Sequence, residues 1–92
     1  MNYTVYILYS ETYNKIYIGH TKNLIKRFYS HNELSKKGWT IKFRPWKVIY
    51  CEYFESKTQA SKKEKQLKFA KGREWIRNKI IFEYKRNGFI SA

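Results

Sequence analysis

The sequence contains no aspartate, and its acidic residues are seven glutamates scattered along 92 residues. Enzymes that transfer phosphoryl groups with two metal ions need several carboxylates that converge on the metal pair. So small a supply of carboxylates argues against a two-metal site. If this chain is a nuclease, we expect it to work with one metal ion or with none.

Cysteine and long apolar segments are also scarce. The single cysteine, Cys51, excludes a disulfide framework and a cysteine-rich zinc site. No apolar run approaches the roughly 18 residues that a membrane-spanning helix requires. The N-terminal segment MNYTVYILYS also lacks the basic region and the cleavage site of a secretion signal. We therefore expect a cytoplasmic protein without a membrane segment.

Positive charge, by contrast, is abundant. Twenty Lys and Arg residues against seven glutamates give a formal net charge of +13. A compact protein with this charge repels itself unless a polyanion offsets the charge, so nucleic acid is the expected partner and an acidic membrane surface is the other candidate. Nine Tyr, six Phe and three Trp residues, within an apolar fraction of 42%, supply one modest core. We expect a single domain over residues 1–92.

The pattern of apolar residues and turn signals predicts the element order ββαβαα. This order is typical of an α+β domain with a small antiparallel sheet of three strands flanked by helices. The strands are expected at residues 3–10, 15–19 and 46–54, and residues 11–14 form the turn between the first two. Residues 35–45 are expected to form a basic loop.

Three helices are expected, each with a start or stop signal. The first is capped by Thr21 and runs to about residue 33. The second is capped by Ser56 and stops at Gly72, and the third covers residues 73–86. The apolar residues on the buried side of the first helix are Leu24, Ile25 and Phe28.

A four-residue turn sets the register of the first hairpin and places Tyr6 opposite Gly19. Because side chains alternate between the two faces of a sheet, Tyr6 and Tyr17 share one face, and Val5 and Ile7 point to the core on the other. A glycine opposite Tyr6 leaves the phenol open to a small substrate group. The pairing alone leaves another interpretation open, in which both rings only cover the back of the sheet.

The tyrosine motifs TVYILYS and YIG, a helix with Arg27 and His31, and a later helical glutamate in SKKEKQLK occur in order along the chain. With these motifs the chain resembles the GIY-YIG nuclease superfamily over nearly its whole length, and most closely the small single-domain bacterial members. The resemblance implies a nuclease that hydrolyses DNA, more than RNA, with one divalent metal ion, Mg²⁺ or Mn²⁺. It assigns catalytic positions to Tyr6, Tyr17, Arg27 and His31, a structural position to Gly19 and the metal ligand to Glu64.

Glu64 is also notable without the resemblance. It follows the apolar stripe of Ala60 and Leu67 on the expected helix, where a carboxylate is costly unless it binds a metal or a charged partner. An ion pair with Lys68, four residues later, is the alternative to the metal. For Tyr6 to act as a base, a nearby cation is expected to lower the pKa of its phenol.

The remaining basic residues suit contacts with a phosphate backbone. We expect such contacts from Lys22, Lys26, Lys36, Lys37, Lys42, Arg44, Lys62, Lys63 and Lys65. Trp39 and Trp46 are candidates for stacking on bases, with core packing as the alternative for Trp46. The sequence thus predicts a metal-dependent DNA nuclease. Two other classes stay open, a non-catalytic nucleic-acid-binding module with the same fold and a protein-interaction domain that binds an acidic partner.

Overall fold

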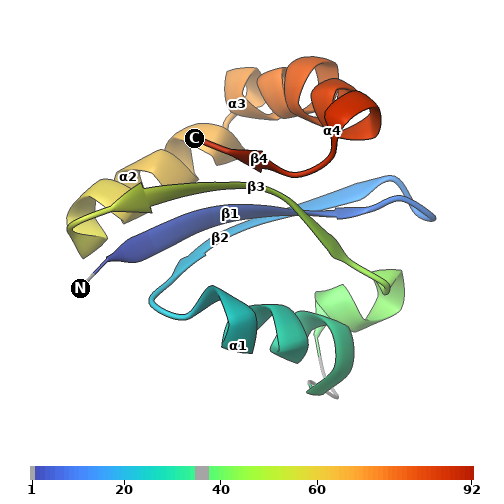
Figure 1. The fold of residues 1–92 in the computed structure, drawn as a ribbon, viewed down its shortest axis with the longest axis horizontal. Coiled ribbons are helices and arrows are strands. Elements are labelled where there is room, and N and C mark those ends of the chain that lie inside the picture. The colour runs from blue at the N-terminus through green and yellow to red at the C-terminus, as the bar shows by residue number, and fades with distance from the viewer. Residues whose placement is uncertain (1, 35–37) are drawn as a thin grey trace.

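A four-stranded sheet with helices on both of its faces forms the centre of the protein (Figure 1). The computed structural model describes residues 2–34 and 38–92. The strands lie in the order β2-β1-β3-β4, with β1 antiparallel to both of its neighbours and β4 parallel to β3. Their bounds are β1 (Tyr3–Ser10), β2 (Lys15–Thr21), β3 (Lys47–Phe54) and β4 (Ile90–Ser91).

The predicted α+β class is confirmed, but the sheet of three antiparallel strands and the order ββαβαα are wrong. The chain continues past the last helix and returns to the sheet, where Ile90 lies opposite Tyr50 of β3. The backbone N–H of Ala92 then donates to the carbonyl oxygen of Cys51 at 2.9 Å. A strand of two residues is too short to show an alternating pattern, so the sequence carries no signal for it.

The first hairpin has the predicted register. Tyr6 pairs with Gly19, Leu8 with Tyr17, and Ser10 with Lys15 across a four-residue turn. This pairing sends alternate side chains of β1 to two separate hydrophobic clusters. The cluster on one face includes Val5, Ile7, Tyr9, Ile16 and Ile18, and the cluster on the other includes Tyr6, Leu8 and Trp46 with Tyr17 packed against them.

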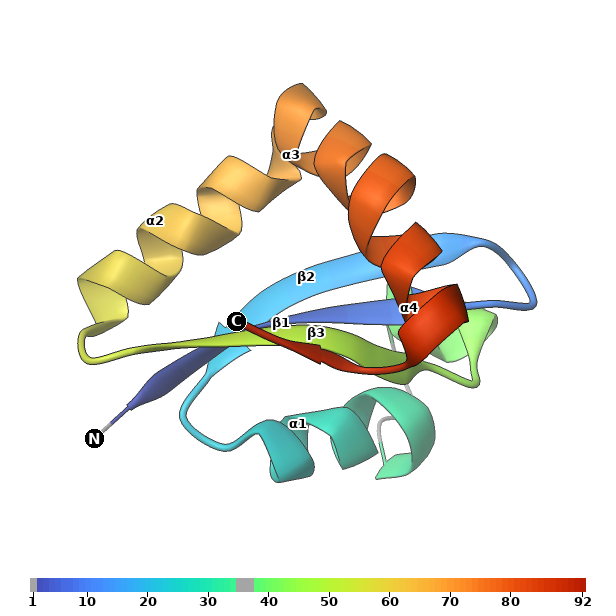
Figure 2. The ribbon, with the colours of Figure 1, turned by 45° about the horizontal axis from the view of Figure 1, so that its top comes forward.

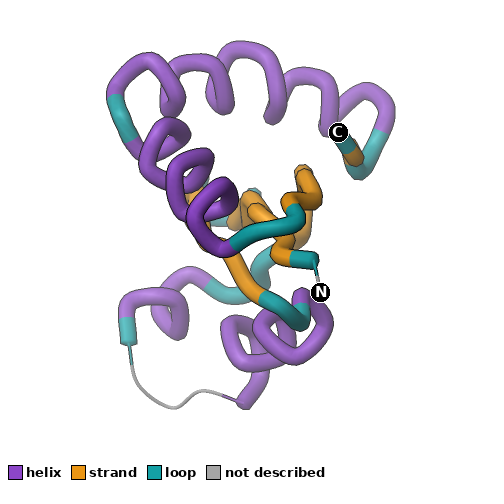
Figure 3. The backbone as a smooth tube through the Cα atoms, turned by 90° about the vertical axis from the view of Figure 1, so that its left-hand side faces the viewer, coloured by secondary structure: helices purple, strands orange, loops and turns teal. Residues whose placement is uncertain are grey.

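The two clusters are covered by different helices, so the sheet is the middle of three layers (Figures 2 and 3). The Val5–Ile7 side lies under α2 (Lys57–Lys68), α3 (Ala70–Trp75) and α4 (Ile81–Asn87), the last two joined by a π-helical segment, Ile76–Ile80. The Tyr6 side is covered by α1 (Leu24–Tyr29) and by a short 3₁₀ helix, Trp39–Phe43, within the segment predicted to be a loop.

The helix α1 begins later than the sequence predicts. Thr21 is the last residue of β2, and Asn23 caps the helix by accepting a hydrogen bond from the N–H of Lys26 at 3.1 Å. Leu24 and Phe28 pack under the sheet as predicted, whereas Ile25 is 74% exposed and the prediction for it is wrong. The helix continues as a π-helical turn, Ser30–Leu34. Turns of this kind are frequent at functional sites.

The sequence predicts that the helix capped by Ser56 stops at Gly72, and this prediction is wrong. The helix begins at the predicted Ser56 cap and ends at Lys68, and Gly72 lies inside α3. A Cβ atom added to Gly72 would clash with the carbonyl oxygen of Gln66 and would lie 2.6 Å from the Cα of Leu67. The glycine is therefore needed because α3 packs directly on the last turn of α2.

Among the residues described, no helix is both long enough and apolar enough to cross a membrane.

Candidate active site

Gly19 lets the side chain of Tyr6 lie across the backbone of β2. A Cβ atom on Gly19 would come within 2.7 Å of the Tyr6 hydroxyl oxygen and 2.9 Å of its Cζ. The predicted close approach at Gly19 is therefore present, but the group that fills the space is the phenol itself. Tyr6 is 0% exposed, so the solvent-open phenol expected from the pairing argument is not observed.

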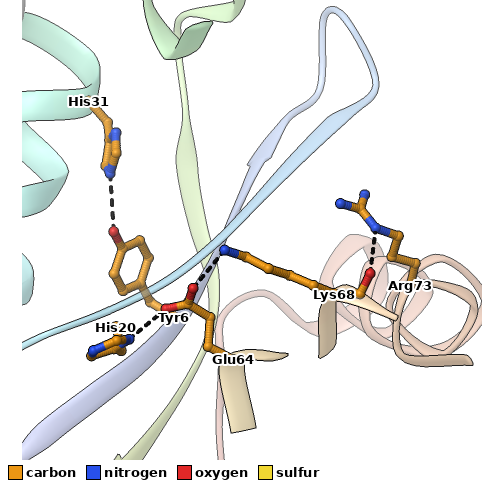
Figure 4. Close-up of polar contacts among 6 residues, drawn as sticks. All are labelled: Tyr6, His20, His31, Glu64, Lys68 and Arg73. Atoms are coloured by element: carbon orange, nitrogen blue, oxygen red, sulfur yellow. Dashed lines mark hydrogen bonds and ion pairs between the residues drawn. The ribbon is translucent and has the colours of Figure 1, made fainter. Parts of the chain in front are cut away.

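The hydroxyl of Tyr6 lies 3.1 Å from Nε2 of His31, and Figure 4 shows the two side chains pointing toward each other. His31 belongs to the π-helical turn after α1 and is only 6% exposed. Its ring is also packed against Tyr17, with ring centroids 4.5 Å apart, and the rings of Tyr6 and Tyr17 are stacked at 6.2 Å. The three rings thus form one cluster between β1, β2 and the turn that follows α1.

Burial dominates the protonation of this cluster. Burial raises the pKa of Tyr6 to about 12, and an opposing polar interaction with Arg27 reduces that shift without cancelling it. The predicted lowering of the Tyr6 pKa is therefore wrong in sign, although Arg27 acts in the expected direction. Burial also lowers the pKa of His31, helped by the charges of Arg27 and Arg44. At neutral pH both partners of the hydrogen bond are uncharged.

Glu64 lies on α2, and each oxygen of its carboxylate is bound by a side chain. One carboxylate oxygen is 2.6 Å from Nδ1 of His20, and the other is 2.6 Å from Nζ of Lys68 (Figure 4). Burial of the carboxyl tends to raise its pKa, but the hydrogen bonds from Lys68 and His20 outweigh it, and the pKa is lowered. The ion pair with Lys68, which was the alternative to a metal at Glu64, is present, and the carboxylate is ionised.

The ionised Glu64 fits a site for a single divalent ion. Mg²⁺ is commonly held by one or two carboxylates, with water and substrate phosphate oxygens as its other ligands. The Glu64 side chain is 18% exposed, and Lys68 already places a positive charge beside it. No group of three or more His, Cys, Asp or Glu side chains suited to a metal is found within the described residues. The described side chains therefore suit a metal ion held by a single protein carboxylate, and not a metal enclosed by several protein ligands.

Most of the chain matches a known protein family. A family model described as the GIY-YIG catalytic domain matches residues 2–79. The chain belongs to the GIY-YIG family. It is 40% identical to a UPF0213 protein of Clostridium perfringens over 68 residues, which cover 74% of this chain and 71% of that protein. A UPF0213 protein of Limosilactobacillus reuteri is 42% identical over 60 residues, covering 63% and 62% of the two chains.

The fold of this GIY-YIG domain also has a counterpart of known structure. The solution NMR structure of a UPF0213 protein from Bacillus halodurans superimposes with a TM-score of 0.55 at 23% sequence identity, over 95% of each chain. At this identity the likeness concerns the fold alone. The predicted membership in the small single-domain bacterial branch of the GIY-YIG family is confirmed by these relatives.

The basic residues predicted to bind nucleic acid lie on several sides of the GIY-YIG domain. Lys63 lies 3.8 Å from Glu52 of β3, and Arg44 donates to the carbonyl oxygen of His31 at 2.7 Å. Lys36 and Lys37 lie outside the described residues. The others, Lys22, Lys26, Lys42, Lys62 and Lys65, are exposed. Of the two tryptophans, Trp46 is a core residue at 1% exposure, and Trp39 is 47% exposed.

Two residues that bind Glu64 were not identified as site residues from the sequence. His20 had no assigned role, yet it holds Glu64 across a sequence separation of 44 residues. Lys68 was considered only as a structural partner. Lys68 also lines a cleft of about 410 Å³, together with Lys15, Tyr17, Arg73 and Arg77. These residues come from three segments of the chain, so no local pattern reveals them.

Proposed function

We propose that this GIY-YIG domain is a cytoplasmic endonuclease that hydrolyses DNA phosphodiester bonds with one divalent metal ion, Mg²⁺ or Mn²⁺. The observation that carries the proposal is the polar cluster around Gly19. His31 and Arg27 both interact with the hydroxyl of Tyr6, and the charge of Glu64 also influences the pKa of that hydroxyl. Groups with shifted pKa values that converge on one atom are typical of catalytic sites.

The proton of the attacking water is assigned to Tyr6 and His31. In the tautomer that carries its proton on Nδ1, the neutral His31 accepts a hydrogen bond from the Tyr6 hydroxyl at Nε2, 3.1 Å away. Once Tyr6 has released its proton to solvent, the phenolate oxygen can take a proton from the attacking water as a general base. This role requires an approach to the phenolic oxygen, which is covered in the protein alone, so binding of the substrate must uncover it.

We assign the binding of the negatively charged phosphate to Arg27. Its side chain is exposed, and interaction with the Tyr6 hydroxyl raises its pKa, so the guanidinium stays positive. A guanidinium binds two phosphate oxygens at once through its parallel N–H groups. Tyr17 packs on His31 and keeps the histidine ring in position.

Glu64 would hold the metal ion, with His20 orienting its carboxylate from β2. When bound, the ion would stabilise negative charge on the leaving 3′ oxygen. Lys68 lies 2.6 Å from the Glu64 oxygen that faces it and must turn away for the ion to bind there.

Substitution of Glu64 tests the proposal. The wild type and Glu64→Gln should be incubated with supercoiled, single-stranded and branched DNA in Mg²⁺ or Mn²⁺, with EDTA controls. We expect cleavage by the wild type and a loss of at least about 10²-fold in the variant, since the metal supplies several kcal/mol. Glu55→Gln, at an exposed position, removes the same charge as a control. Equal metal-dependent cleavage by wild type and Glu64→Gln would remove Glu64 from the mechanism.

A non-catalytic nucleic-acid-binding module is the second candidate. It is favoured by the ion pair between Glu64 and Lys68, since a carboxylate with both oxygens bound can be purely structural. Binding of DNA with no cleavage of any of the three forms would select this candidate. A weak dependence of binding on salt would instead favour an acidic protein partner.

A further inference from the structure

A positively charged cleft runs along the outer side of β2, next to the candidate active site. It encloses about 410 Å³, and its lining includes Tyr17 and Trp39 together with Lys15, Lys68, Arg73 and Arg77. Among the strands that the structure describes, β2 is at the edge of the sheet. The cleft is therefore open on the side away from β1, and Tyr17 connects it with the ring cluster of Tyr6 and His31.

The two arginines of the cleft are held in place by neutral groups. Nη1 of Arg77 donates to Oδ1 of Asn14 at 2.7 Å, and Nη2 donates to the Asn14 carbonyl oxygen at 3.1 Å. Nε of Arg73 donates to the carbonyl oxygen of Lys68 at 3.0 Å, as Figure 4 shows. Each arginine is thus oriented by amide and carbonyl oxygens, which leave its charge uncompensated.

The charge of the cleft is not balanced within the described part of the chain. None of the ion pairs found there includes Lys15, Arg73 or Arg77, and Lys68 is paired with Glu64. Like charges gathered in a cleft raise its positive potential and attract anions. The arrangement of fixed guanidinium groups matches the recognition of phosphate oxygens.

We propose that this cleft binds the sugar–phosphate backbone of the nucleic-acid strand that flanks the scissile phosphate, on the side of the β1–β2 turn. Arg73 and Arg77 bind its phosphates from one wall, and Lys15 binds from the start of β2. The distance along β2 from Lys15 to Gly19 is about 13 Å at a rise of about 3.3 Å per residue. The position relative to the cleaved bond rests on the proposed function, whereas phosphate binding by the cleft does not.

The test compares two double variants that each remove two positive charges. Arg73→Gln with Arg77→Gln changes the cleft, and Lys79→Gln with Arg86→Gln changes exposed positions away from its lining. Binding of labelled single-stranded and duplex DNA is measured in EDTA across about 50 to 200 mM salt. We expect the cleft variant to bind about tenfold more weakly per lost contact near 0.1 M salt, and the slope of log K against log salt to fall by about 2. The control double should keep the wild-type slope.

Equal losses of DNA affinity in the two double variants would overturn the proposed role of the cleft, because they would show that binding depends on total charge alone. Since Arg77 also holds Asn14, unfolding of each variant is monitored, and Lys15→Gln provides a second test at the start of β2. Lys15→Gln is expected to reduce the slope by about 1. An unchanged slope in both Lys15→Gln and Arg73→Gln would refute the proposal even if the double variant fails to fold.

Cleavage separates this proposal from the proposed function. In an active enzyme, the cleft variant should raise KM and leave kcat near its wild-type value, because the contacts lie away from the reacting phosphorus. A fall in kcat with unchanged KM would contradict a role in strand binding. If the wild type cleaves no DNA, the nuclease proposal fails while the salt dependence in EDTA still decides whether the cleft binds phosphates.

Discussion

The hydroxyl oxygen of Tyr6 and Nε2 of His31 lie 3.1 Å apart, and neither residue is more than 6% exposed. Burial shifts the two pKa values in opposite directions, upward for the phenol and downward for the imidazole. Both shifts favour the uncharged form, so the pair at neutral pH is a hydrogen bond between neutral groups. A nuclease that uses Tyr6 as its base must therefore remove a proton that the free protein holds tightly.

The first prediction concerns the pH dependence of cleavage. Because the Tyr6 pKa is about 12, the fraction of phenolate grows about tenfold for each pH unit across the neutral range. We expect log kcat/KM to rise with a slope of about 1 from roughly pH 7 to 9. Tyr6→Phe should lower cleavage by at least about 10²-fold, and Tyr84→Phe, on α4, serves as the control. A rate independent of pH in this range would argue against Tyr6 as the base.

The second prediction concerns stability at alkaline pH. The folded-state pKa of Tyr6 is raised from 10.0 to about 12, so Tyr6 contributes stability below pH 10 that is lost as the pH rises toward 12. A shift of two pKa units corresponds to about 3 kcal/mol. In urea unfolding, the stability advantage of the wild type over Tyr6→Phe should therefore shrink between about pH 9 and 11. A constant difference across this range would show that Tyr6 is not desolvated in the folded protein.

The hairpin could be predicted from the sequence because its information is local. A four-residue turn and alternating side chains are enough to place Tyr6 opposite Gly19, and the observed register agrees. The burial of Tyr6 depends instead on α1 and on Trp46, which reach the sheet from distant parts of the chain. The sign of the Tyr6 pKa shift was missed for that reason, since a nearby cation is visible in a motif and desolvation is not.

At Glu64, too, the local position could be predicted from the sequence, whereas the contact with a distant part of the chain could not. Its place on the apolar stripe of α2 follows from helical periodicity, and Ala60 and Leu67 on that stripe are buried. The bond from His20 joins β2 to α2 and has no sequence signal, because the two residues are 44 positions apart. Gly72 was misread for a related reason. A glycine after a helical segment predicts a helix end, whereas close packing between two helices requires the third dimension.

The third prediction tests the contact between Gly19 and Tyr6. Gly19→Ala would place a methyl group 2.7 Å from the Tyr6 hydroxyl, so the buried ring must leave its present position beside His31. We expect a loss of about 1–3 kcal/mol in the free energy of unfolding and a loss of cleavage. In the double variant with Tyr6→Phe the closest atom is absent, and part of the loss in stability should be recovered. Strictly additive effects of the two changes would show that the contact does not form.

The fourth prediction concerns Glu64 at acid pH. Burial alone would raise the pKa of its carboxyl, but the bonds from Lys68 and His20 lower it below 4.5. A lowered carboxyl pKa contributes stability that is present above the unfolded-state value and is lost as the pH falls through the folded-state value. The stability of the wild type relative to Glu64→Gln should therefore decline as the pH falls from about 5 to 3. Unfolding in urea at a series of pH values measures this difference, and His20→Asn should reduce it because one of the two bonds to the carboxylate is lost. A wild-type advantage that grows toward acid pH would mean that Glu64 is bound as a neutral acid, and it would contradict both the ion pair and the metal site proposed for this carboxylate.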